Sequence, residues 1–195
     1  MTKTEIRVLI KDSCRQQKEL LAPKSSQICD NIINSPPYKQ ADEIFSYMAL
    51  PDEVDLTKVM LQAIKDGKKV AVPKITSQEQ NLMKFFYLDA QKAIAEQTSN
   101  GAYGISEPDE AMPATPDETK NILILVPGRA FTKEGDRLGR GKGFYDRFLN
   151  KEIVGSSPTM TRLPNVSVAG VCFDFQILES LPTDENDICM DIVFC

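Results

Sequence analysis

The segment ILVPGRAFTKEGDRLGRGKGFYDRFL, residues 124 to 149, runs from a strand-like apolar stretch through a basic, glycine-rich loop into an amphipathic stretch. Between residues 129 and 147 it holds six Lys or Arg against three Asp or Glu, whereas the whole chain has a net charge of -5. In an open α/β sheet, ligands bind beyond the carboxyl ends of the strands. This basic loop follows such a strand, so we expect it to form part of an anion site.

Glycines alternate with basic residues at the centre of this loop, in the order Gly139, Arg140, Gly141, Lys142, Gly143. Because glycine has no side chain, the backbone N–H groups of this loop can approach phosphate oxygens. A helix beginning near Gly143 adds its own free N–H groups. The spacing is neither that of a Walker A loop nor GxGxxG. A tight turn with a solvated basic surface would explain the glycines alone. The strand exit and the excess positive charge together favour a phosphate-binding loop.

The rest of the chain alternates between two hydrophobic periods. Short segments rich in β-branched or aromatic residues are typical of strands, and apolar residues three and four apart are typical of helices. This alternation predicts a three-layer α/β/α sandwich with a mostly parallel, Rossmann-like sheet, in a single domain of residues 1–195. Expected strands are 43–50, 68–75, 83–88, 121–128, 166–173 and 188–194; expected helices are 6–21, 26–33 and 55–67; expected loops are 98–121 and 155–165.

Composition limits the possible functions. A net charge of -5 and a pI near 4.9 argue against a general nucleic-acid or anionic-membrane binder, which normally carries an extended basic face. The five cysteines are scattered and form no CxxC pair, which fits reduced thiols in a cytosol. Charged residues interrupt the first fourteen positions, so neither a signal peptide nor a membrane span is expected there. We expect a cytoplasmic monomer that binds small molecules.

The chain contains no histidine. This excludes Ser–His and Cys–His nucleophile pairs and the common histidine-based zinc sites. Carboxylates, basic groups, backbone amides or a hard cation must therefore carry any chemistry. One interpretation of Lys142 and Asp146, which are four residues apart, is an ordinary ion pair on a helix. The other is that a cation links Asp146 to a bound phosphate, because Mg²⁺ binds one or two carboxylates together with phosphate oxygens. Lys3 and Arg7 lie at the start of the opening helix, where the helix dipole disfavours positive charge. Their presence there indicates either a nearby anion or a terminus that is exposed to solvent.

Five motifs resemble the 5-formyltetrahydrofolate cyclo-ligase family, and the resemblance covers nearly the whole chain. They are YMALPDEVD (47–55), KKVAVPK (68–74), GISEP (104–108), VPGRAFTKEGDRLGRGKGFYDRFL (126–149) and LPTDENDICMDIV (181–193). The resemblance implies an ATP-dependent, Mg²⁺-requiring conversion of 5-formyltetrahydrofolate to 5,10-methenyltetrahydrofolate, with release of ADP and phosphate. It also implies that ATP phosphorylates the formyl oxygen before the anilino nitrogen closes the ring.

The resemblance also implies roles for individual residues. ATP would be bound by Lys3, Arg7, Arg137, Leu138, Gly139, Arg140, Gly141, Lys142, Gly143, Phe144 and Tyr145. Folate would be contacted by Met48, Glu53, Arg140, Gly141, Lys142, Gly143 and Phe144. Catalysis would involve Arg140, Lys142 and Tyr145, and Mg²⁺ would be bound by Asp146 and Asp187.

Tyr103, in the expected loop 98–121, would stack on the pterin or the adenine, or else be an isolated loop aromatic. Two positions depart from frequent family residues: Phe144 replaces Tyr, and Lys74 replaces Arg. At Asn186 many bacterial members have His, but Asn also occurs in the family. A non-catalytic nucleotide-binding or regulatory module is the main alternative. A sugar-phosphate isomerase or acyl-CoA transferase on a related scaffold is the second. Glu53, Asp146 and Asp187 together favour the enzyme, because a simple binding module needs no metal pair beside a polar pterin contact.

Overall fold

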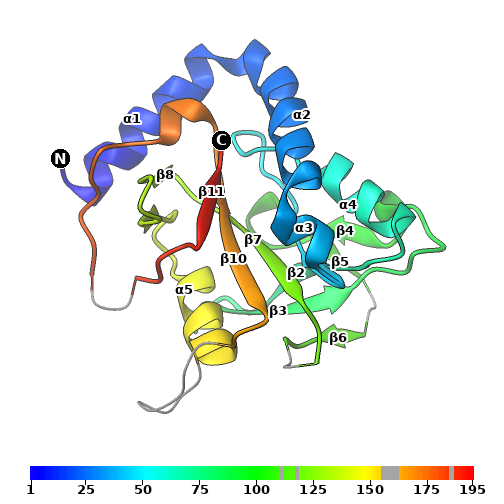
Figure 1. The fold of residues 1–195 in the computed structure, drawn as a ribbon. Helices are drawn as coiled ribbons and strands as arrows, with labels where there is room; N and C mark the ends of the chain where they lie inside the picture. Colours follow the sequence, from blue (N-terminus) through cyan, green and yellow to red (C-terminus); the bar gives the residue numbers. More distant parts are fainter. Residues whose placement is uncertain (110–111, 117–118, 155–162, 185–186) are drawn as a thin grey trace.

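The structure is a computed structural model that describes residues 1–109, 112–116, 119–154, 163–184 and 187–195. Its strands are β1 (Glu43–Phe45), β2 (Lys69–Ser77), β3 (Leu82–Tyr87), β4 (Thr98–Asn100), β5 (Ser106–Pro108), β6 (Pro113–Ala114), β7 (Ile122–Pro127), β8 (Ala130–Phe131), β9 (Arg137–Leu138), β10 (Val166–Val171) and β11 (Ile192–Phe194). Seven of them form one sheet in the order β11-β10-β7-β1-β2-β3-β6 (Figure 1). Pairings from β11 to β2 are parallel, and β3 and β6 pair antiparallel. The predicted mostly parallel sheet is confirmed.

Helices cover both faces of this sheet. They are α1 (Lys3–Gln16), α2 (Lys18–Asn34), α3 (Pro36–Gln40), α4 (Thr57–Lys65) and α5 (Phe144–Leu149), with a π-helical turn η3 (Asn150–Val154) and 3-10 turns η1 (Ile94–Glu96), η2 (Ala102–Gly104) and η4 (Asp174–Gln176). Successive strand side chains point to opposite faces. In β7, Leu125 packs in the cluster that contains Ile32 of α2 and Met60 of α4, whereas Ile124 packs with Phe148 of α5. The α/β/α layering follows from this alternation.

The first two helices differ from the expected 6–21 and 26–33. Helix α1 begins earlier because Thr2 and Glu5 form a capping box: Thr2 Oγ1 accepts from Glu5 N at 3.3 Å, and Glu5 accepts from Thr2 N at 2.7 Å. The break between α1 and α2 lies at Gln17, and Pro23 is accommodated inside α2. Apolar spacing alone does not register either feature. Helix α4 agrees with prediction and is followed by Gly67, whose φ of 76° suits a helix C-terminus.

Two predicted strands are too long. Strand β1 ends at Phe45 instead of residue 50, and β11 covers only 192–194 of the expected 188–194. After β1 the chain leaves the sheet while remaining apolar, because Tyr47, Met48 and Leu50 line a pocket instead of extending the strand. A strand and a pocket wall have similar compositions, so composition does not separate them.

The prediction that residues 98–121 form a loop without secondary structure is wrong. The segment contains the antiparallel pair β4 and β5, with turn η2 between them, and the short strand β6. Lys74 fastens this hairpin to β2, because its Nζ donates to Pro108 O at 2.7 Å and to Asp109 O at 3.2 Å. Most of the second expected loop, residues 155–162, and Asn186 lie outside the described residues.

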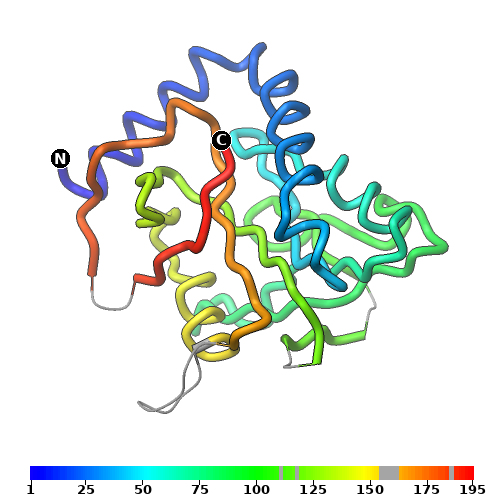
Figure 2. Tube along the Cα trace, in the orientation of Figure 1, coloured from blue at the N-terminus to red at the C-terminus, as the bar shows by residue number. Residues whose placement is uncertain are grey.

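Helix α1 lies against the β8–β9 hairpin rather than against the main sheet. Ile6, Ile10 and Cys14 form a buried cluster with Ala130 and Leu138. Figure 2 shows the chain that follows β10 returning alongside α1, and its residues Phe175, Leu178 and Leu181 pack on the same cluster. This packing brings the N-terminal residues beside the glycine-rich loop. None of the described helices is long and apolar enough to cross a membrane.

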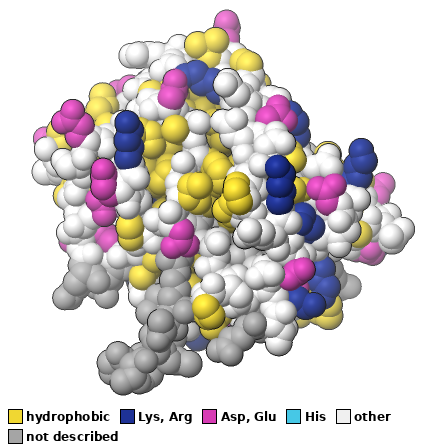
Figure 3. Space-filling model, viewed as in Figure 1, with side chains coloured by type: hydrophobic (Ala, Val, Ile, Leu, Met, Phe, Trp, Pro, Cys, Tyr) yellow, Lys and Arg dark blue, Asp and Glu magenta, His cyan; other side chains and the backbone are white. Residues whose placement is uncertain are grey.

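Charge on the surface agrees with the composition. On the face drawn in Figure 3, Lys and Arg side chains occur singly or in small groups among Asp and Glu side chains, with hydrophobic side chains between them. That face therefore carries no continuous basic surface of the kind that binds nucleic acid.

Candidate functional site

A pocket of about 770 Å³, including its open mouth, lies beyond the carboxyl ends of β1 and β7 and beside Pro73 and Ile75 within β2. From β1 the chain continues to β2 on one side, while β7 pairs on the other side, so the strand order reverses between β1 and β7. Ligands of open α/β sheets bind at such switch points. The position of the pocket therefore suits a small-molecule site.

Both apolar and polar side chains line the pocket. The apolar ones include Met48, Ile75, Met83, Ile105 and Phe144. The charged ones are Glu53, Glu107, Arg137, Arg140, Lys142 and Asp146. A pocket of this composition suits a ligand with a largely apolar body and polar or charged groups.

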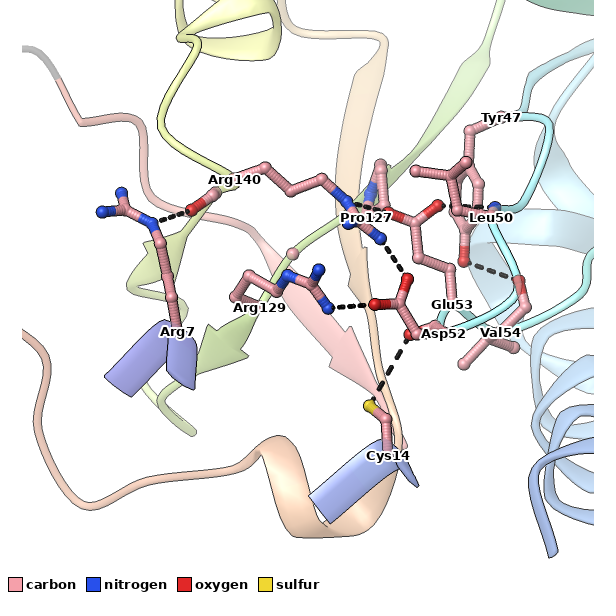
Figure 4. Close-up of polar contacts among 12 residues, drawn as sticks. Arg7, Cys14, Tyr47, Leu50, Asp52, Glu53, Val54, Pro127, Arg129 and Arg140 are labelled. Atoms are coloured by element: carbon pink, nitrogen blue, oxygen red, sulfur yellow. Dashed lines mark hydrogen bonds and ion pairs between the residues drawn. The ribbon is translucent and has the colours of Figure 1, made fainter. Parts of the chain in front are cut away.

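The glycine-rich loop forms one side of the pocket and requires glycine at two positions. Gly141 and Gly143 have φ values of 98° and 71°, in the left-handed region that residues with a side chain rarely adopt. Helix α5 begins directly after Gly143, as predicted. Arg7 Nε donates to Gly139 O at 2.9 Å, so α1 contacts the loop (Figure 4). The structure thus brings the predicted residue Arg7 to the loop across 132 positions of sequence.

Arg140 is held by two carboxylates that follow β1 (Figure 4). Its Nε donates to Glu53 Oε1 at 2.8 Å and its Nη2 contacts Asp52, which also accepts from Arg129 Nη1 at 2.6 Å. Glu53 Oε2 accepts from Leu50 N at 3.0 Å. Burial alone would raise the pKa of Asp52, but the hydrogen bonds from Arg140 and Arg129 lower it below its usual value. Burial alone would lower the pKa of Arg140, but Glu53 and Asp52 raise it.

Arg137 is the most enclosed basic residue of the loop, with a side chain only 4% exposed. One Nη donates to Pro127 O at 3.2 Å and the other pairs with Asp146. Its Nε is buried without a hydrogen-bond partner among the described residues. Asp146 therefore pairs with Arg137, and the ordinary helix pair with Lys142 does not form; Lys142 Nζ instead lies 5.7 Å from the ring centre of Tyr103.

The second predicted metal ligand, Asp187, pairs with the predicted ATP ligand Lys3. Lys3 Nζ lies 2.9 Å from Asp187 and 2.6 Å from Asp184. Burial alone would raise the pKa of Asp187, but Lys3 lowers it, and the charge of Arg137 adds to the lowering. Arg137 thus acts on both predicted metal ligands. Within the described residues there is no group of three or more acidic, Cys or His side chains that could hold a metal alone.

Three other predicted residues occupy distinct positions. The ring of Tyr103 is 49% exposed and lies edge-on to Phe144, with ring centres 6.2 Å apart, so it stands beside the pocket mouth. Tyr145 packs against both cores, and its burial, followed by the charge of Glu53, raises the pKa of its phenol. Leu138 is buried against α1, so only its backbone can face a ligand.

The 5-formyltetrahydrofolate cyclo-ligase family model matches residues 2–195. The chain belongs to this family. It is 29% identical over 196 residues to a probable 5-formyltetrahydrofolate cyclo-ligase of Schizosaccharomyces pombe, covering 98% of this chain and 93% of the relative. It is 28% identical over 195 residues to the Mus musculus 5-formyltetrahydrofolate cyclo-ligase, covering 98% and 88%.

A solved structure with the same fold supports the family assignment. It is the NMR structure of Aquifex aeolicus 5,10-methenyltetrahydrofolate synthetase, with a TM-score of 0.78 and 31% identity, covering 100% of this chain and 89% of that one. The resemblance that the motifs indicated, and the enzyme class that it implied, are confirmed.

Within this family, the structure explains one departure from frequent residues. Lys74 points to backbone carbonyls of the β5 end, where an ammonium group has two acceptors and needs no bidentate fork. Phe144 lines the pocket beside Tyr103, and nothing in the structure explains the absence of a hydroxyl there.

Three residues of the site escaped prediction: Asp52, Glu107 and Arg129. Asp52 joins Arg129 to Arg140, and Glu107 is 8% exposed and lines the pocket. Asp52 and Glu107 lie within quoted motifs, but neither has a spacing that indicates a chemical role. Burial of a charged side chain is the signal that identifies them, and it appears only in the folded chain.

Proposed function

We propose that this chain converts 5-formyltetrahydrofolate to 5,10-methenyltetrahydrofolate in an ATP- and Mg²⁺-dependent reaction that releases ADP and phosphate. One observation carries the proposal: the glycine-rich loop borders the apolar pocket on one side and Arg7 on the other. Arg140, Lys142 and Gly143 line the pocket, while the carbonyl of Gly139 contacts Arg7. In this proposal, a phosphate site and a site for the folate ring system adjoin across one loop.

ATP would lie on the side of the loop that faces α1. Lys3, Arg7 and the run 137–145 would bind it, with backbone N–H groups of the loop directed at phosphate oxygens. The positive charge of Arg137, whose side chain is only 4% exposed, favours an anion near this loop.

Asp146 and Asp187 fit a magnesium site only together with phosphate oxygens. Two carboxylates are the usual protein contribution to such a site, and the substrate phosphates complete it. Bound there, Mg²⁺ would neutralise phosphate charge during transfer. Arg137 and Lys3, which pair with these carboxylates, would orient them.

Folate would occupy the apolar pocket. Met48 and Phe144 would contact the ring system, Tyr103 would cover it at the mouth, and Glu53 would offer a carboxylate. Glu53 can contact folate only if it also keeps its hydrogen bond with Arg140 or gives that bond up. Arg140 therefore stands between the two substrates.

The reaction needs alignment more than proton abstraction. The formyl oxygen would attack the γ-phosphorus and displace ADP; the anilino nitrogen would then attack the formyl carbon, and phosphate would leave as the ring closes and that nitrogen loses its proton to solvent or phosphate. Arg140 and Lys142 would neutralise the transferring group. Because burial raises the pKa of Tyr145, its phenol keeps its proton and would act as a hydrogen-bond donor, not as a base.

A coupled assay tests this proposal. Each 5-formyltetrahydrofolate consumed should yield one ADP, one phosphate and one methenyl product, whose conjugated amidinium gives a new near-ultraviolet absorbance. An ATP analogue without a transferable γ-phosphoryl should compete with ATP and give no absorbance change. Nucleotide binding without either product would indicate a regulatory module. Full-rate product formation without ATP would contradict the mechanism.

A further inference from the structure

Glu107 is a buried carboxylate inside the pocket that the proposed chemistry does not use. It lies on β5, is 8% exposed, and lines the pocket near Ile75 and Ile105. Its Oε1 accepts a hydrogen bond from Ile75 N at 3.1 Å, next to a register shift between β2 and β3. One oxygen of the carboxylate is thus occupied by the protein backbone.

The other oxygen of Glu107 is available. No described residue donates to Oε2, and no described Lys or Arg forms an ion pair with this carboxylate. Oε2 lies beside Gly101 but is not among the fully enclosed, unpartnered side-chain atoms of the described chain, so part of its surface stays accessible at a residue that lines the pocket. A carboxylate in apolar surroundings is costly unless it is hydrogen-bonded. Its free oxygen is therefore a strong acceptor for a ligand.

Surrounding backbone holds the carboxylate in place. A Cβ at Gly101 would come within 2.4 Å of Glu107 Cδ, so only glycine leaves room for the side chain to lie across the turn. Lys74 fastens the end of β5 to β2 through Pro108 O and Asp109 O. The side chain is consequently fixed before a ligand arrives, which reduces the entropy cost of binding.

We propose that Glu107 binds the donor edge of the pterin ring of 5-formyltetrahydrofolate, that is, its 2-amino group and the adjacent ring N–H. This inference rests on the proposed function. The pterin edge presents two neighbouring donors to an acceptor, whereas the adenine amino group is flanked by ring nitrogens that accept and would be repelled by a carboxylate. Phosphate groups would be repelled as well. Ile75, Met83 and Ile105 supply the apolar surroundings for the ring.

Glu107→Gln separates recognition from a merely structural role. Glutamine keeps one oxygen for Ile75 N but places an amide donor opposite the pterin donors. Binding is measured by titration calorimetry without ATP, using 5-formyltetrahydrofolate and its 2-desamino-2-methyl analogue on wild type and variant. Glu79→Gln is the matched control, because Glu79 is exposed in the turn between β2 and β3.

Wild type should bind the analogue roughly ten- to a hundredfold more weakly than the substrate, since a hydrogen bond to a charged group is lost. Glu107→Gln should weaken substrate binding by a similar factor and abolish most of the difference between the two ligands, while ATP affinity stays unchanged. Glu79→Gln should behave as wild type.

Equal binding of both ligands by wild type would overturn the inference, and this comparison needs no variant to fold. A Glu107→Gln protein that weakens both ligands equally, or that loses ATP affinity instead, would also overturn it. The proposed function fails separately, if wild type binds 5-formyltetrahydrofolate but forms no methenyl product with ATP.

Discussion

Arg137 and Arg140 stand three residues apart in one loop, yet their surroundings differ. Arg137 is 4% exposed and pairs with Asp146 nine positions away, whereas Arg140 is 34% exposed and pairs with Asp52 and Glu53 on a different loop. The two ends of one motif therefore have different roles. The Arg137 end is a nearly enclosed guanidinium that holds the loop to α5, and the Arg140 end is a partly exposed contact with the loop after β1.

Arg137→Ala should have the largest effect on stability. Removing one member of a fully buried ion pair costs about 3–5 kcal/mol, and the cost here should approach the lower end because Asp146 is 25% exposed. We expect the free energy of unfolding to fall by this order, measured by urea denaturation, with turnover lost as well. Arg140→Ala is the matched control, and the same truncation three residues away should cost less, because the Arg140 side chain is 34% exposed and Asp52 keeps its pair with Arg129. Equal losses of stability in the two variants would contradict the contrast.

Arg140→Ala should instead reduce turnover with the fold retained. Losing a charge-assisted hydrogen bond to the transferring phosphoryl group costs about 1.5–3 kcal/mol, or roughly one to two decades in rate. Lys142→Ala should reduce the rate less, because a flexible ammonium orients a phosphoryl group less well than a guanidinium fork. Steady-state rates at saturating ATP and folate measure both. Small and equal effects would indicate that this end of the loop is only a solvated surface.

Asp146→Asn should shift the Mg²⁺ requirement. An amide oxygen is a weaker ligand than a carboxylate for a hard cation. The Mg²⁺ concentration that gives half-maximal activity should therefore rise by roughly tenfold or more. Asp12→Asn, an exposed change on α1, should leave the Mg²⁺ titration unchanged. If the titration for Asp146→Asn overlays that of wild type, Asp146 does not bind the metal. Some loss of stability accompanies this variant, because Arg137 loses its ionic partner.

The smallest expected effect is on acid stability. The pKa of Asp52 and of Asp187 is lower in the folded protein than in the unfolded chain. Their contribution is therefore complete above the unfolded value of about 4 and is lost as pH falls through the folded values. Thermal melting followed from pH 6 to pH 3 should show a shallower decline for Asp52→Asn than for wild type. If the melting temperature falls with pH equally steeply in both proteins, Asp52 is not one of the stabilising carboxylates.

Sequence alone was sufficient for features that depend on neighbours along the chain. Hydrophobic period, glycine spacing and local charge predicted the strand, loop and helix between residues 122 and 149, as well as the parallel α/β class. Motifs also indicated the family. These signals are local, so they survive without knowledge of the fold. They failed where a local pattern was ambiguous: the apolar run after β1 lines a pocket, and the Pro-containing segment 98–108 forms a hairpin.

Only the tertiary structure decided which charged groups meet. Strand β1 pairs with β7, so the loop after β1 meets the loop after β7 although 87 residues separate Arg140 from Glu53. Packing of the β4–β5 hairpin on β2 buries Glu107 beside Ile75 N, and packing of α1 on the β8–β9 hairpin places Arg7 against Gly139. Spacing in the sequence cannot specify such contacts, because each depends on strand order and on which side chains the packing excludes from water.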